Sequence, residues 1–170
     1  MVSVNMQKKN NKTQLVNKQS CIQIGARNSP VNHENLQYSV LHIDDDQFTL
    51  QLSKYFLEEV CSNDNLVIES ESDSTRIQTW LYQDHDCYLV DYSMPNMNGL
   101  AVCQKIRELK DTPIILFTSK EPKDIPLDSF EKLDVKYHQK SSDPENYFTL
   151  SDAIMDLVRQ DIDPTSKMIK

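Results

Sequence analysis

Residues 88–99 read Tyr-Leu-Val-Asp-Tyr-Ser-Met-Pro-Asn-Met-Asn-Gly. An apolar run ends in the carboxylate of Asp91, a proline and a lone glycine follow, and an amphipathic helical pattern begins at Gly99. This order predicts a strand, then a loop, then a helix. In open α/β sheets, ligands bind at the edge formed by the carboxyl ends of the strands. Asp91 is therefore the first candidate functional residue.

The same strand-then-helix pattern occurs five times. The predicted strands are 40–43, 66–69, 87–90, 114–117 and 135–139, and the predicted helices are 47–60, 73–82, 99–110, a short one starting near Pro126, and 145–159. Strands that alternate with helices indicate a parallel sheet covered on both faces and joined by right-handed crossovers. The predicted fold is an α/β three-layer (βα)5 sandwich with a five-stranded parallel sheet.

Apolar spacing predicts which side chains of these helices face the core. In the first helix the apolar residues expected on one face are Phe48, Leu52, Tyr55, Phe56 and Val60. In the third helix they are Leu100, Cys103, Ile106 and Leu109, and Asn98 is a plausible N-cap. His42 lies within the first strand, and we expect it to be a hydrogen-bonded core histidine.

Charge divides the chain into two parts. Residues 1–36 hold five basic residues and one acidic residue, so the rest of the chain, which has a net charge of −8 overall, carries −12. The first part has few large apolar side chains and is predicted to be a disordered basic tail; residues 161–170 are predicted to be a short polar tail. An acidic body argues against DNA binding and suits a site that holds cations.

The cysteines and the apolar runs of the sequence bear on the cellular compartment of the protein. The four cysteines show no close pairing, so neither a zinc site nor a disulfide framework is predicted. The first thirty residues lack the apolar core of a secretory signal, and no apolar run approaches the ~18 residues that span a bilayer. We therefore expect a cytoplasmic protein that does not bind membranes.

Polar residues gather where the predicted strands end. The first strand leads into three consecutive carboxylates, the third into another, the fourth into two hydroxyls and the fifth into a lysine: Asp44, Asp45, Asp46, Asp91, Thr118, Ser119 and Lys140. Crowded carboxylates repel one another unless a cation neutralises them, and hard oxygen ligands suit Mg²⁺. A hydroxyl and an ammonium suit the oxygens of a transferred phosphoryl group. The set therefore predicts a carboxylate nucleophile with a metal and two charge stabilisers.

These residues resemble the response-regulator receiver domain of two-component signalling, which has a flavodoxin-like, doubly wound fold. The resemblance covers residues 37–160 and rests on five features in order: the acidic cluster, the Asp-x-x-Met-Pro-x-Met-x-Gly run from Asp91, the hydroxyl of Thr118, the aromatic Tyr137 and the strand-ending Lys140. It implies a signalling domain, not classed as an enzyme, that takes a phosphoryl group from a sensor histidine kinase or phosphotransfer protein and changes its partner-binding face.

The resemblance also implies a role for each matched residue. Asp91 would be the phospho-acceptor. Asp44, Asp45, Asp91 and the Ser93 backbone carbonyl would bind Mg²⁺, with Asp44 acting largely through water. Thr118 and Lys140 would stabilise the phosphoryl group, and Thr118 and Tyr137 would form the switch.

The pattern departs from the family in one place and leaves alternatives open. Ser141 follows Lys140 where the family usually has proline, as in many archaeal receivers. No segment after Arg159 has the length or charge of a DNA-binding module, so the resemblance favours a stand-alone regulator with an unidentified downstream target. The alternative is an interaction module that kept the fold but works without phosphorylation. A flavin enzyme is disfavoured because the chain has only two glycines and no phosphate-cradling loop.

Overall fold

The computed structural model describes residues 36–61, 65–126 and 128–162. Strands and helices alternate along this part of the chain as the sequence predicts. The strands are β1 (Tyr38–Ile43), β2 (Leu66–Glu71), β3 (Cys87–Val90), β4 (Ile114–Thr118) and β5 (Val135–Gln139). The α-helices are α1 (Gln47–Tyr55), α2 (Ile77–Trp80), α3 (Gly99–Arg107), α4 (Asp128–Leu133) and α5 (Glu145–Ile162).

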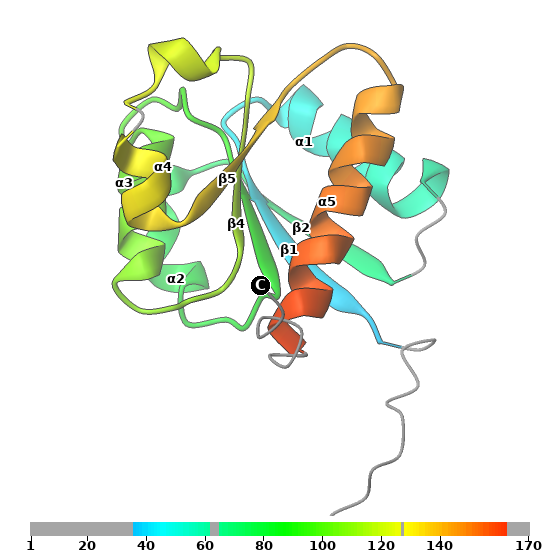
Figure 1. The fold of residues 1–170 in the computed structure, drawn as a ribbon, viewed down its shortest axis with the longest axis horizontal. Coiled ribbons are helices and arrows are strands. Elements are labelled where there is room, and N and C mark those ends of the chain that lie inside the picture. Colours follow the sequence, from blue (N-terminus) through cyan, green and yellow to red (C-terminus); the bar gives the residue numbers. More distant parts are fainter. Residues whose placement is uncertain (1–35, 62–64, 127, 163–170) are drawn as a thin grey trace, which may run out of the picture. The chain divides into compact units, whose positions relative to one another are not determined.

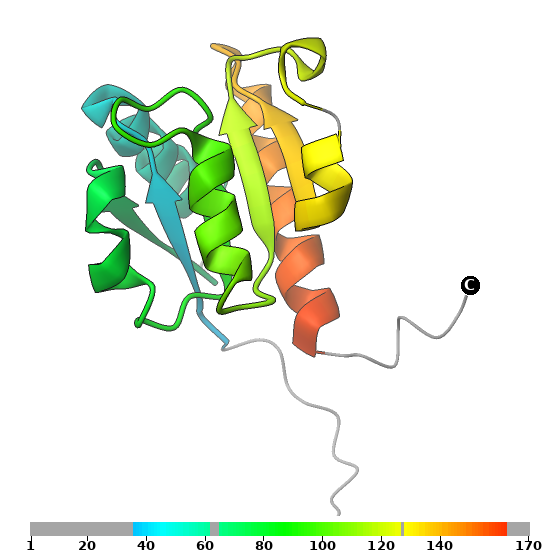
Figure 2. The ribbon, with the colours of Figure 1, turned by 90° about the vertical axis from the view of Figure 1, so that its left-hand side faces the viewer.

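The five strands form one parallel sheet in the order β2-β1-β3-β4-β5. The chain runs from β1 outward to the edge strand β2 and then returns to place β3 on the other side of β1, so the winding reverses between β1 and β3. Binding crevices form at such a reversal, beyond the carboxyl ends of the strands. Figure 2 shows the arrows pointing to one common edge, where Asp44, Asp91, Thr118 and Lys140 follow or end their strands.

Helices cover both faces of the sheet, as Figure 1 shows, and each face has its own apolar core. One core lies under α2, α3 and α4 and includes Ile43, Val90 and Leu116 from the strands. The other lies under α1 and α5 and includes Val40, Leu89 and Phe117. Alternate residues of a strand point to opposite faces, which is why neighbours such as Leu89 and Val90 belong to different cores. The predicted α/β three-layer sandwich is confirmed.

The predicted inner face of the first helix is wrong in part. Phe48 and Tyr55 are 68% and 56% exposed, whereas Leu50, Ser53 and Leu57 are buried. The buried residues have the spacing of one helical face, but the polar Ser53 in its middle hides that face from a pattern based on apolar residues. The segment Phe56–Val60 continues α1 as a π-helix. Phe56 does pack inward, with its ring stacked 4.6 Å from that of Tyr147.

Other helices differ from prediction in their extent. The segment predicted as a helix from Asp73 to Tyr82 is a 3₁₀ turn (Ser74–Arg76) followed by the short α2. The fourth helix is short and starts late, as expected with two prolines before it, although Leu127 lies outside the described residues. Leu109 falls beyond the end of α3 and is 61% exposed, so its predicted burial is wrong.

The predicted tails cannot be compared with the structure. Residues 1–35 and 163–170 lie outside the described part of the chain, so the disordered basic tail stays a prediction. At the other end, α5 extends to Ile162, two residues past the predicted boundary of the folded domain. Within the described residues, no helix combines the length and apolar character needed to span a bilayer.

Candidate functional site

The sheet register brings two carboxylates together at the edge. Ile43 of β1 is paired with Val90 of β3, and Asp91 N donates to Ile43 O at 2.9 Å, so Asp44 and Asp91 leave adjacent strands side by side. Asp44 and Asp91 are 1% and 5% exposed, respectively, whereas Asp45 is exposed. One carboxylate oxygen from each of Asp44, Asp45 and Asp91 lies within 4.8 Å of the others. The three predicted carboxylates therefore do converge.

Lys140 closes the site from the end of β5. Its Nζ donates to Asp44 Oδ2 at 2.6 Å and to Asp91 Oδ1 at 2.7 Å. Its backbone is fixed because Lys140 N donates to Thr118 O at 2.8 Å, which continues the pairing of β5 with β4. Ser141 in place of proline therefore leaves the lysine within reach of both carboxylates.

Electrostatics favours the charged forms of Asp44 and Lys140. Burial acts to raise the pKa of Asp44, but the nearby His42 imidazole and the Lys140 ammonium outweigh it, and the pKa lies below its usual value. Burial acts in the opposite direction on Lys140, and the two carboxylates outweigh it, so the pKa of Lys140 is raised. Each partner thus favours the charged form of the other.

The loop after Asp91 holds the carboxylate in place. Ser93 N donates to Asp91 Oδ2 at 2.5 Å. The loop then closes on itself, with Gly99 N donating to Tyr92 O at 2.9 Å. Asn98 caps α3 by accepting from Ala101 N at 2.9 Å, which confirms the predicted N-cap. Side chains on both sides of the loop therefore fix its path.

Gly99 is required by the close approach of this loop to the strand end. A Cβ at Gly99 would clash with the carbonyl oxygen of Asp91 and would lie 2.8 Å from Tyr92 Cα. Both are backbone atoms, which cannot rotate away as a flexible side chain can. The sequence singled out this glycine as part of a motif, and the structure supplies the steric reason for it.

Thr118 ends β4 and Tyr137 lies within β5, and neither side chain hydrogen-bonds Asp91. Thr118 is fully buried, and its Oγ1 accepts a long hydrogen bond from Lys120 N at 3.4 Å. Tyr137 packs edge-on against Phe130, and its hydroxyl donates to Lys120 O at 2.7 Å. Both predicted switch residues therefore bond the same residue of the loop after β4, a link that sequence spacing could not reveal.

His42 is a residue whose environment the sequence did not predict. It is fully buried, as expected, but neither ring nitrogen hydrogen-bonds any residue in the part of the chain that the structure describes, so the predicted hydrogen bonding is wrong. Its Nε2 lies 3.6 Å from Asp44 Oδ2, slightly beyond a hydrogen bond. Only the spacing of positions 42 and 44, two apart on one strand face, could have pointed to this contact.

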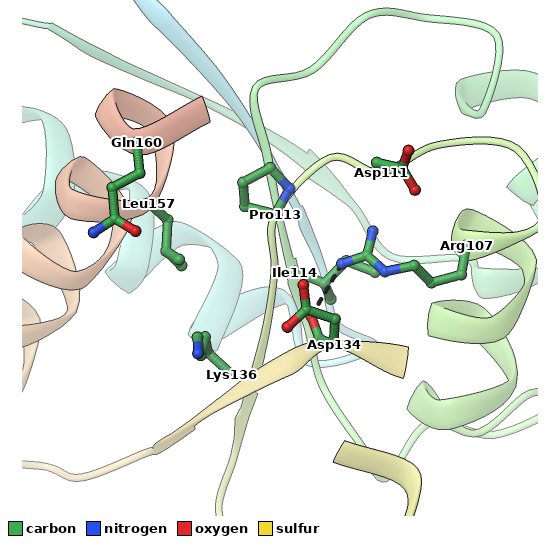
Figure 3. Close-up of a pocket in the computed structure, with 8 residues that line it drawn as sticks. All are labelled: Arg107, Asp111, Pro113, Ile114, Asp134, Lys136, Leu157 and Gln160. Carbon is green, nitrogen blue, oxygen red and sulfur yellow. Dashed lines mark hydrogen bonds between the residues drawn. The ribbon is translucent and has the colours of Figure 1, made fainter. Parts of the chain in front are cut away.

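A cavity of about 220 Å³ lies at the opposite end of the strands, beside Pro113 and Asp134 (Figure 3). Arg107 projects into it from α3, but its guanidinium donates to four backbone carbonyls, those of Lys110, Thr112, Leu133 and Asp134. Because its donors already hold the turns before β4 and β5, this arginine supports the fold. The cavity contains none of the predicted site residues.

Comparison with known proteins identifies the family of this chain. The model of the response regulator receiver domain matches residues 40–150, so the chain belongs to that family. The response regulator ArlR of Staphylococcus epidermidis is 32% identical over 83 residues, which cover 48% of this chain and 36% of ArlR. The transcriptional regulatory protein ResD of Bacillus subtilis is 37% identical over 82 residues, covering 48% of this chain and 32% of ResD. The matched region thus spans about a third of these curated relatives.

Solved structures share the fold. A response regulator receiver domain protein from Clostridium thermocellum has a TM-score of 0.61 at 24% identity, covering 73% of this chain and 96% of that one. The response regulator TrrA of Thermotoga maritima, solved in complex with Mg²⁺-BeF, has a TM-score of 0.57 at 25% identity, covering 71% of this chain and 99% of TrrA. The flavodoxin-like receiver fold is confirmed.

Proposed function

We propose that this receiver accepts a phosphoryl group on Asp91 in a Mg²⁺-dependent reaction and signals through the loop after β4. The observation that carries the proposal is the contact of Lys140 Nζ with both Asp44 and Asp91, beside a third carboxylate. This supplies, within one site, a nucleophile, a cation for the phosphoryl oxygens and oxygen ligands for a metal.

The residues present fit a magnesium ion. Three carboxylates, two of them buried, offer only hard oxygen donors, which Mg²⁺ prefers and which commonly bind it alongside several waters. Asp45 and Asp91 would hold the ion directly, Asp44 largely through water, and the Ser93 carbonyl would complete the protein ligands. The ion would supply positive charge to the phosphoryl oxygens. TrrA, which shares the fold, was solved with Mg²⁺-BeF, and this supports the assignment.

The chain's own groups account for the transfer. A carboxylate oxygen of Asp91 attacks the phosphorus while the bond from phosphorus to the donor, a phosphohistidine or a small acyl phosphate, breaks. The Ser93 N–H and the Lys140 ammonium orient the carboxylate before attack. Lys140 is then positioned to neutralise charge on the transferred group, and the Thr118 hydroxyl can bind one of its oxygens after a small movement.

Phosphorylation would alter the partner-binding face by changing the hydrogen bonds that Thr118 and Tyr137 make with the backbone of Lys120. Thr118 accepts from Lys120 N and Tyr137 donates to Lys120 O, so a movement of the threonine hydroxyl toward a phosphoryl group breaks one of these bonds and affects the other. Response regulators act with histidine kinases or phosphotransfer proteins, and we propose such a donor for this chain. Its target, and whether it acts without an attached output domain, stay open predictions.

The test is phosphorylation of the purified protein by a small acyl phosphate with Mg²⁺, followed by intact mass spectrometry. Wild type is expected to gain one phosphoryl group per chain and Asp91→Asn none. Asp134→Asn is the matched control: this exposed aspartate lies before β5 with φ of 45°, a conformation that asparagine adopts readily. Labelling of Asp91→Asn at the wild-type rate would refute the proposal, as would equal labelling of wild type with and without a metal chelator.

A further inference from the structure

His42 is the buried polar side chain that the proposed reaction leaves without a role. It lies on the α1–α5 face of β1, two residues before Asp44, and is 0% exposed. Its ring is 5.8 Å from the Phe117 ring, centroid to centroid, and Lys140 Nζ lies 5.6 Å from the same Phe117 centroid. His42 is therefore buried next to the charged side chains of Asp44 and Lys140.

Packing alone does not explain a histidine at this position. The flanking β1 residues that face the cores, such as Val40 and Ile43, are aliphatic, and burying an imidazole without hydrogen bonds costs free energy that an aliphatic side chain would not. Of its two ring nitrogens, Nε2 faces a carboxylate, at 3.6 Å from Asp44 Oδ2. That oxygen also accepts from Lys140 Nζ at 2.6 Å, while Asp44 Oδ1 accepts from Asp46 N at 3.0 Å.

We propose that His42 is a positioning residue for the metal site: its Nε2–H supports the Asp44 carboxylate from the protein interior and so fixes the orientation in which Asp44 contributes to Mg²⁺ binding. The inference rests on the proposed function. Groups that hydrogen-bond a metal's carboxylate ligands fix ligand orientation, and their loss typically lowers metal affinity by about 10- to 100-fold. Lys140 Nζ and Asp46 N each donate to one oxygen of Asp44, and His42 Nε2 faces Asp44 Oδ2 at 3.6 Å from within the sheet.

Three substitutions separate positioning from packing. His42→Gln places an amide N–H near the position of Nε2, His42→Asn places one near Nδ1, and His42→Leu fills similar space with no donor. The measurement is the Mg²⁺ dissociation constant by isothermal titration calorimetry, with unfolding by urea monitored in parallel. We expect Kd to rise roughly 10-fold or more in His42→Leu and His42→Asn and to stay within about 3-fold of wild type in His42→Gln. We expect His42→Leu to have a stability close to that of wild type, because it removes a buried Nδ1 that has no hydrogen-bond partner but also the contact of Nε2 with Asp44.

The outcomes distinguish this inference from the proposed function. If wild type binds Mg²⁺ and His42→Leu binds it equally well, or if all three variants lose affinity equally, His42 is a packing residue and the inference is overturned. If wild type itself shows no Mg²⁺ binding, the metal assignment fails, and the inference fails with it. Should His42→Leu not fold, the comparison of His42→Gln with His42→Asn decides the matter, since both keep a polar side chain.

Discussion

Lys140 is the residue that places a positive charge against two buried carboxylates. Its ammonium lies within 2.7 Å of both Asp44 and Asp91, and its side chain is only 18% exposed. Without it, two nearly buried carboxylates would face each other with no adjacent cation in a poorly solvated environment, which destabilises the folded state. The lysine is therefore important to the metal-free fold, in addition to the role proposed for it in phosphoryl transfer.

Lys140→Met tests this role. Removing one partner of a fully buried ion pair costs ~3–5 kcal/mol; because Lys140 is partly exposed, we expect a loss of roughly 2 kcal/mol in the free energy of unfolding of the metal-free protein at neutral pH. Mg²⁺ should restore part of it by supplying the missing positive charge. Urea denaturation with and without Mg²⁺ measures both effects. Lys132→Met, which alters an exposed pair with Asp128 at 3.9 Å, is the matched control and should change little. Equal stability of the two variants would contradict this account.

The connection from β3 to α3 is the element that positions Asp91, the proposed nucleophile. Gly99 N bonds Tyr92 O, Asn98 caps α3, and the Gly99 Cα packs against the backbone of Asp91. A change in this turn is therefore transmitted to the carboxylate without any change to a charged residue.

Gly99→Ala is expected to reduce phosphorylation as well as stability. The new methyl group would clash with the Asp91 carbonyl, so the turn must open and the carboxylate must move relative to Lys140 and Ser93. Asn98→Ala removes the adjacent cap at a cost of about 1 kcal/mol but leaves the turn its glycine, so it controls for stability alone. Rates of labelling by an acyl phosphate, measured with urea denaturation, should fall far more in Gly99→Ala than in Asn98→Ala. Similar rates in both variants would mean that the turn does not position Asp91.

At the level of elements, the sequence predicts strands better than helix faces. Each strand was located within two residues at either end, because a buried parallel strand is a short apolar run between polar residues. Burial on α1 was mispredicted because Ser53 lies in the middle of its inner face and Phe48 and Tyr55 are exposed. Such choices depend on which neighbour a helix packs against, and periodicity alone does not contain that information.

Across the site, residue types were predictable but contacts were not. A shared sheet edge brings Asp44, Asp45, Asp91 and Lys140 together once the fold is parallel α/β. The bonds of Thr118 and Tyr137 to Lys120, and the approach of His42 to Asp44, depend on side-chain directions. These details appear only in the structure.

At the scale of the whole molecule, three histidines of the described residues link stability to pH: His42 and His85 are buried, and His138 is half-buried. Burial is the main cause that lowers the pKa of His42, His85 and His138 below the usual histidine value of 6.5. As pH falls through 6.5 the unfolded chain takes up protons on these residues before the folded protein does. The unfolded state is therefore favoured as pH falls. The contribution of these neutral histidines to the free energy of unfolding is fully present above pH 6.5 and is progressively lost below it. The carboxylates with lowered pKa values, such as Asp44, lose their contribution only as pH falls below 3.8.

Urea denaturation of the metal-free protein at a series of pH values on both sides of 6.5 measures this dependence. The free energy of unfolding is expected to decline as pH falls below 6.5, and replacing His85 and His138 together by glutamine should make the decline shallower. Both residues lie outside the acidic site, so the comparison does not involve the proposed metal ligands. A stability that is constant across this range, or one that rises as pH falls, would contradict the sign derived from burial.

The most direct test of the central claim is to locate the phosphoryl group itself. Borohydride reduces an aspartyl phosphate to homoserine, so treatment of the phosphorylated protein followed by peptide mass spectrometry identifies the modified position. The account predicts homoserine at position 91 in protein incubated with Mg²⁺ and an acyl phosphate, and none in protein incubated without the donor. Homoserine at position 44, 45 or 46 instead, or a phosphorylated protein with no reducible aspartate, would contradict it.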